Sequence, residues 1–122
     1  MTPKDLLLHQ TRVAYDGDDC MSLRASLWKI TEDMASQRLT EGTPTIAEIV
    51  HHVAHWKIEY CRQGFARWQG PIPPATGKLQ DAIALLERAQ AHLVQCLESC
   101  SDEDLANPVP IQFHGRSAAH FF

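Results

Sequence analysis

The chain has 122 residues, of which 44% are hydrophobic and 21% are charged, and its formal net charge is −4. This length and composition suit one globular domain, taken here as residues 1–122, that can bury a core without disulfides. The acidic charge and the lack of a Lys/Arg cluster argue against nucleic-acid binding. No apolar run reaches the roughly 18 residues of a membrane span, and the N-terminus lacks the apolar stretch of a signal peptide. We therefore expect a cytoplasmic protein without a membrane partner.

The first third of the chain predicts one longer helix and two short ones. A helix from about Pro3 to Tyr15 begins with a proline suited to a first turn, and Thr2 can cap it. The run DGDD ends this helix. Two short helical segments follow, which Ser22 and Thr31 can cap.

Two long helices are expected after the loop LTEGTPT. The first opens at a capping box formed by Thr45 and Glu48 and runs to about Gln69, where GPIPP ends it. The second runs from about Gly77 to Cys100, with Thr76 as its cap. Its apolar residues recur at the spacing of a packed helix, at Leu79, Ile83, Leu86, Leu93 and Leu97. Long amphipathic helices with few strand signals predict an all-α bundle.

The four cysteines are scattered and form no CxxC motif; they are Cys20, Cys61, Cys96 and Cys100. In a domain of this size, that pattern indicates reduced thiols in a cytosolic protein. Cys96 and Cys100 lie four residues apart on one expected helix and could be half of a thiolate metal site. We favour the simpler interpretation that they are small apolar residues on a packed helix.

Three histidines lie close together in the stretch TIAEIVHHVAHWKIEY. At about 100° per residue, the core-facing stripe of this helix is predicted to contain Ile46, Ile49, Val50, Val53, Trp56 and Tyr60. His51 and His55 then fall on a solvated face, whereas His52 lies at the edge of the stripe and can point into a seam between helices. His52 is thus a candidate metal ligand, with a merely hydrogen-bonded edge residue as the alternative.

The segment TIAEIVHHVAHWK strongly resembles the second-helix motif of the DinB-like (YfiT-like) metalloenzyme superfamily. The stretch SLRASLWKITEDMASQRL and the later order of a long helix, SDEDLANPVP and GRSAAHFF also resemble that family, so the resemblance covers essentially the whole chain. It implies an up-and-down helical bundle with one long crossover. Three main helices are expected here, and only the start of the fourth, near Ser117, so the domain is C-terminally incomplete relative to the family.

The resemblance also implies a metal site. Family members commonly bind a divalent metal through three histidines, one from the second helix and a His-x-x-x-His pair from the fourth. The first ligand position matches His52, and Glu48, Trp56 and Glu59 would line the pocket or support the ligand.

The second and third ligands of that site have no match in this sequence. No His-x-x-x-His pair follows, and neither His114 nor His120 matches a family position, although either could serve from a partner chain. We therefore expect zinc or nickel at low occupancy in this chain alone.

A bundle without most of its fourth helix would expose an apolar groove, and such surfaces mark association sites. The sequence therefore predicts a homodimer in which each subunit covers the open face of the other. A partner chain, a domain swap or a truncated chain are alternatives that the sequence leaves open.

Two classes of function stay open. Characterised relatives include thiol-dependent transferases and isomerases that use small thiols such as mycothiol or bacillithiol, which implies a metal-dependent, thiol-transferase-like or hydrolase-type enzyme. The alternative is a metal-free helical bundle without catalytic activity that dimerises or binds a small ligand between its helices. The sequence identifies neither a substrate nor catalytic residues.

Overall fold

The structure is a computed structural model, which describes residues 2–17, 22–65 and 68–106. The helices are α1 (Pro3–Asp16), α2 (Leu23–Ser26), α3 (Glu32–Ala35), α4 (Ile46–Phe65), α5 (Leu79–Ser99) and α6 (Asp102–Ala106). The described part contains no strand, so the predicted all-α fold is confirmed. None of its helices combines the length and the apolar character needed to cross a membrane.

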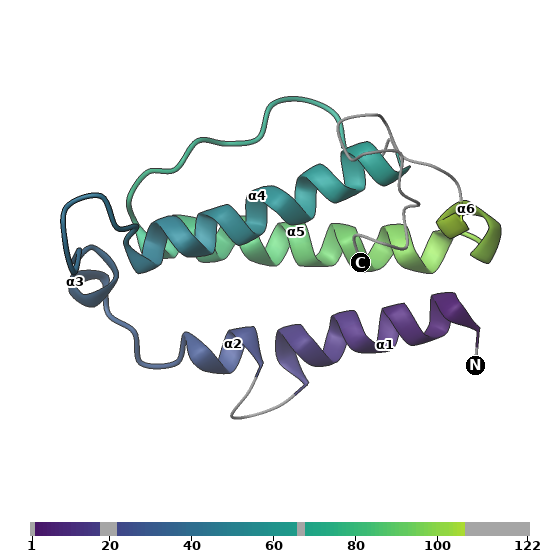
Figure 1. Ribbon diagram of the computed structural model, residues 1–122, viewed down its shortest axis with the longest axis horizontal. Coiled ribbons are helices and arrows are strands. Elements are labelled where there is room, and N and C mark those ends of the chain that lie inside the picture. The colour runs from purple at the N-terminus through teal and green to yellow at the C-terminus, as the bar shows by residue number, and fades with distance from the viewer. Residues whose placement is uncertain (1, 18–21, 66–67, 107–122) are drawn as a thin grey trace.

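The three long helices lie side by side (Figure 1). Helices α4 and α5 run in the same direction, and the connection between them returns along the outside of the bundle, which is the long crossover that the family resemblance implies. Helix α1 runs antiparallel to α5 and lies along it. The parallel pairing places residues of α4 beside residues of α5 that come about 33–35 positions later in the chain, as with Lys57 and Gln90 and with Cys61 and Cys96.

The helix starts in the first half of the chain follow local capping chemistry. Thr2 and Asp5 form a capping box at α1, and Thr45 and Glu48 form another at α4, where Glu48 N donates to Thr45 Oγ1 at 3.1 Å. The predicted cap at Thr31 is also confirmed, because its hydroxyl accepts from the amide of Met34. Ser22 caps α2 in the same way, with Ala25 as the donor.

The start of α5 differs from the prediction that Thr76 caps it. Lys78 occupies the N-cap position and makes no capping hydrogen bond through its side chain. Instead the Glu32 carboxylate of α3 accepts from Leu79 N at 2.6 Å and from Gln80 N at 3.0 Å. A carboxylate 47 residues earlier in the chain thus satisfies the free amides and complements the positive end of the helix.

The buried face of α4 is rotated from the predicted one. The buried residues are Ala47, Val50, Ala54, Ile58 and Cys61, each at most 3% exposed. By contrast Ile49 and Trp56 are 47% and 37% exposed, so the prediction that they belong to the core is wrong. The physical reason is size: Ala47, Ala54 and Cys61 are small enough to let α4 pack closely on α5, whereas the prediction gave the core to the largest apolar side chains.

The C-terminal end of α4 also differs from the prediction. The helix ends at Phe65, and Trp68 and Gln69 are not helical, although the sequence predicted a helix to about Gln69. Further along, the α5 stripe is largely as predicted, because Leu79, Leu86, Leu93 and Leu97 are buried and Ile83 packs against the core.

Candidate metal centre

The three histidines of α4 have distinct surroundings. His51 is half-buried and its Nε2 lies 2.8 Å from the carbonyl oxygen of Pro73 in the crossover, so the prediction of a solvated position is wrong for this residue. His55 is half-buried too and packs edge-on against Trp56, with ring centroids 5.6 Å apart. The crossover between α4 and α5 covers part of the α4 face that the helical periodicity predicted to be exposed to solvent.

His52 is exposed and lies at the rim of a groove between α1 and α4. Its ring packs edge-on against Trp56 at a centroid distance of 6.1 Å. Among the described residues, His52 belongs to no group of three potential metal ligands. His114 and His120, the two candidate partners, lie outside the described residues, so the role of His52 as a ligand stays a prediction.

The two glutamates predicted to support His52 are engaged elsewhere. Glu48 forms an ion pair with Arg38 and accepts from the amide of Thr45. These contacts hold the pKa of Glu48 below its ordinary value, with the hydrogen bond from Arg38 as the main cause. Glu59 pairs with Arg62 at 3.0 Å. Both carboxylates therefore stabilise α4 and its entry loop.

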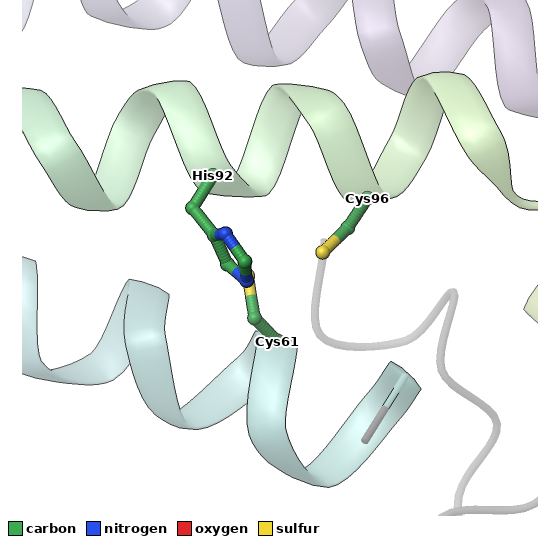
Figure 2. Close-up of side chains that lie close together, drawn as sticks. All are labelled: Cys61, His92 and Cys96. Atoms are coloured by element: carbon green, nitrogen blue, oxygen red, sulfur yellow. The ribbon is translucent and has the colours of Figure 1, made fainter. Parts of the chain in front are cut away.

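A different group of potential ligands lies between α4 and α5. One atom each from Cys61, His92 and Cys96 lies within 4.8 Å of the other two, so these residues, here called the Cys–His–Cys group, could together hold a metal ion. Figure 2 shows His92 and Cys96 extending from α5 toward α4, and Cys61 extending from α4 toward α5. Cys61 and Cys96 are buried, at 0% and 1% exposure, whereas His92 is half-buried.

The packing of the two long helices determines this arrangement. His92 and Cys96 are four residues apart, which places both side chains on one face of α5. Cys61 lies on the core face of α4, near the end of the helix, and reaches the same level because the two helices run in parallel. The surrounding core consists of Leu93, Leu97, Cys100 and Leu105, with Leu7 and Leu8 of α1 packed against it.

The Cys61 thiol favours its neutral form when no metal is bound. A hydrogen bond with Cys96 and burial together raise the pKa of Cys61 far above its ordinary value, and the Lys57 ammonium one turn earlier opposes the effect only weakly. A metal ion would reverse this preference, since a coordinated thiol is deprotonated.

His92 is the member of the Cys–His–Cys group that is partly exposed to solvent, and an aromatic ring packs against it. Trp68 packs edge-on against the imidazole, with centroids 5.1 Å apart, and the Arg88 guanidinium lies over the same indole at 5.6 Å. The indole Nε1–H of Trp68 is buried and has no acceptor among the residues that the structure describes. A buried donor of this kind marks a place where a water molecule or a ligand would be stabilised.

The sequence interpretation did not find this group. It paired Cys96 with Cys100, whose thiol instead donates to the carbonyl oxygen of Leu97. The available signal was the spacing His92-x-x-x-Cys96, which places a nitrogen and a sulfur ligand on one helical face. The third ligand, Cys61, comes from α4. Which residues of α4 and α5 lie at the same height along the helix axes can be known only from the way the two helices pair.

Comparison with known proteins supports the fold. Neither a search of curated proteins nor a search of solved structures gives a match. A family comparison matches residues 20–122 to the DinB superfamily, which covers most of the chain and includes α2 to α6. The chain therefore belongs to the DinB superfamily, as the helix-two motif and the helical bundle with its long crossover indicate.

Proposed function

We propose that this protein is a metal-binding member of the DinB superfamily and that its metal, most favourably zinc, binds at the Cys–His–Cys group. The observation that carries the proposal is that three ligand atoms of two helices lie within 4.8 Å of one another. Thiolate and imidazole ligands together suit zinc better than the harder cations, and nickel is the next candidate.

The distances are close to what a tetrahedral site needs. With Zn–S bonds of about 2.3 Å, two sulfur ligands of a tetrahedral zinc are about 3.8 Å apart. Distances of up to 4.8 Å would therefore have to shorten by about 1 Å between the sulfurs, and slightly more between a sulfur and the imidazole nitrogen, through small side-chain rotations. Among the described residues the group has three members, so a fourth coordination position would be left to water or a substrate.

An open fourth position is typical of catalytic rather than structural zinc sites. A bound metal would there act as a Lewis acid that lowers the pKa of a coordinated water or thiol. The half-buried His92 would give this position its route to solvent, and the indole N–H of Trp68, which has no acceptor among the described residues, could donate to a group bound there. This supports the metal-dependent, thiol-transferase-like or hydrolase-type activity that the sequence led us to expect.

The predicted three-histidine site remains a second candidate for the metal. Exposure of His52 at the groove rim leaves it accessible to a metal, yet a single imidazole does not make a tight site. The two candidates predict opposite results for the same pair of variants, so one experiment separates them.

Metal content of the purified, reduced protein tests the proposal. After incubation with zinc and removal of excess metal, we expect about one equivalent per chain, and cobalt should give the charge-transfer absorption of a cobalt–thiolate bond. Cys61→Ser and Cys96→Ser should each lose most of the zinc and the cobalt absorption. Cys100→Ser is the matched control, since this buried cysteine lies outside the group, and it should retain both.

His52→Ala completes the comparison. Retention of zinc by His52→Ala together with its loss from the cysteine variants supports the Cys–His–Cys group. Loss of zinc from His52→Ala with retention in Cys61→Ser would contradict the proposal and assign the metal to the groove. Less than a tenth of an equivalent in the wild-type protein would contradict both.

A further inference from the structure

The groove between α1 and α4 contains a lysine whose surroundings are unusual for a cation. Lys57 is half-buried, and its Nζ donates to Gln90 Oε1 on α5 at 2.7 Å. The ammonium also lies 5.8 Å from the centroid of the Tyr15 ring at the end of α1. Gln90 is itself only 6% exposed, and its amide nitrogen donates to Thr11 O, so the acceptor of Lys57 is held in place from both sides.

Lys57 has no carboxylate partner in the part of the chain that the structure describes. The ion pairs found there are formed by Arg12, Arg24, Arg38 and Arg62. Burial lowers the pKa of Lys57, and the opposing effect of Cys61 is smaller. A partly desolvated ammonium with one neutral acceptor still has two hydrogen-bond donors to offer.

The groove beside Lys57 has the size and lining of a small-molecule site. Its volume is about 470 Å³, within the range of about 300–1,000 Å³ that is common for ligand pockets. Its lining comes from three helices and consists of Gln10, Thr11, Ala14, His52, Val53, Trp56, Lys57, Tyr60 and Leu93. The walls are thus mainly apolar and aromatic, and Lys57 is the one cation among these lining residues.

We propose that this groove binds a small organic carboxylate with an apolar or aromatic body, with the Lys57 ammonium as the counter-ion of the carboxylate. The Trp56 ring and the side chains of Val53 and Leu93 would contact the body of the ligand. We choose an anion because of charge complementarity: the ligand would supply the negatively charged partner that Lys57 does not have among the described residues. The site is separate from the Cys–His–Cys group, so this inference goes beyond the proposed metal binding and does not depend on it.

A second hollow in the structure provides a contrast. A cavity of about 590 Å³ lies between α2 and α5 and is also lined by a cationic side chain, that of Arg24. Arg24 already pairs with Asp16 at 3.2 Å and with Glu87 at 3.8 Å, and both carboxylates line the same cavity. An anion there would have to displace these acids, so the charge argument selects the groove at Lys57 and not the larger cavity.

Binding of 4-phenylbutyrate, compared with the neutral 4-phenylbutan-1-ol, tests the inference. We expect calorimetry to detect the carboxylate with a Kd at least about tenfold lower than that of the alcohol, as one charge-assisted hydrogen bond would give. Lys57→Met keeps most of the unbranched, apolar part of the side chain and removes the charge, and it should weaken carboxylate binding about tenfold or more while leaving binding of the alcohol unchanged. Lys29→Met is the matched control, since Lys29 lies over Trp28 away from the groove, and it should bind like the wild type.

A measurement on the wild-type protein keeps the test independent of the variants' folding. Addition of 4-phenylbutyrate should shift the methyl NMR signals of Val53 and Leu93, which line the groove, and leave those of Leu23 and Leu39, which do not, in place. Equal affinity of Lys57→Met and wild type for the carboxylate would overturn the assignment. So would the absence of methyl shifts at millimolar 4-phenylbutyrate, or shifts confined to residues outside the groove.

Discussion

Zinc should stabilise this protein against unfolding, and the replacement of one buried cysteine should abolish that effect. A ligand that binds only the folded chain stabilises it by RT ln(1 + [L]/Kd), which is about 2.7 kcal/mol at a free concentration of 100 Kd. For a domain of this size, the urea dependence of the unfolding free energy is about 1–3 kcal/mol per molar. The urea midpoint should therefore rise by about 1–3 M in zinc, less any contribution from zinc bound by the unfolded chain.

Three variants make this prediction specific to the Cys–His–Cys group. Cys61→Ser changes a residue that is 0% exposed, so the metal-free variant will be less stable than the wild type, and only its response to zinc is compared. That response should vanish in Cys61→Ser and persist in both Cys100→Ser and His52→Ala. Unfolding is followed by far-ultraviolet circular dichroism in reducing buffer with and without zinc. An equal zinc-dependent shift in Cys61→Ser and wild type would refute the reasoning.

Three further predictions concern the fold and its ionisation. Ile58→Ala should destabilise the protein by about 2–5 kcal/mol, because Ile58 is fully buried. Ile49→Ala should cost much less, since Ile49 is 47% exposed. Equal losses of stability in urea unfolding would contradict the observed orientation of α4, with Ile58 toward the core and Ile49 away from it. Glu32→Ala should cost about 1 kcal/mol through the lost cap of α5, against almost nothing for the exposed Glu41→Ala. The raised pKa of Cys61 means that its thiol stays neutral in the folded chain while the unfolded chain ionises above about pH 9, so stability should fall with rising pH there. Relative to Cys61→Ser, the metal-free wild type should lose about 1.4 kcal/mol of unfolding free energy per pH unit between pH 9.5 and 10.5. If the unfolding free energies of the two proteins change with pH in parallel, the prediction is wrong and the thiol ionises freely in the folded chain.

Local chemistry in the sequence was sufficient to predict most helix starts. The caps at Thr2, Ser22, Thr31 and Thr45 depend on contacts three residues apart, so their pattern is visible in the chain itself. The cap of α5 was missed because its carboxylate, Glu32, comes from another helix. Similarly, the face of α4 was misjudged because the choice between Ile49 and Ala54 as a core residue depends on how closely α5 approaches, which periodicity does not specify.

The candidate site shows the same limit. The sequence identified the family, yet it directed attention to His52, which is exposed, interpreted Cys96 and Cys100 as packing residues, and gave Cys61 no role beyond a reduced thiol. What brings the two thiols together is the parallel pairing of α4 and α5, a property of the crossover between them. The predicted homodimer stays a prediction, and light scattering at micromolar concentration would test it.

The parallel pairing also explains how one seam could carry both proposed sites. Residues 57 and 61 are one turn, or about 6 Å, apart on α4, and each meets a polar or ligating residue of α5, with Gln90 opposite Lys57 and Cys96 opposite Cys61. Lys57 lines the groove beside α1, whereas Cys61 lies on the buried face, so a carboxylate and a metal would approach from different sides. If the two sites act together, a carboxylate bound at Lys57 should change the affinity for zinc, and by linkage zinc should change the affinity for the carboxylate by the same factor. Measuring 4-phenylbutyrate binding with and without zinc, in wild type and in Cys61→Ser, determines whether they are coupled. A factor of one in the wild type would show two separate sites on a shared pair of helices.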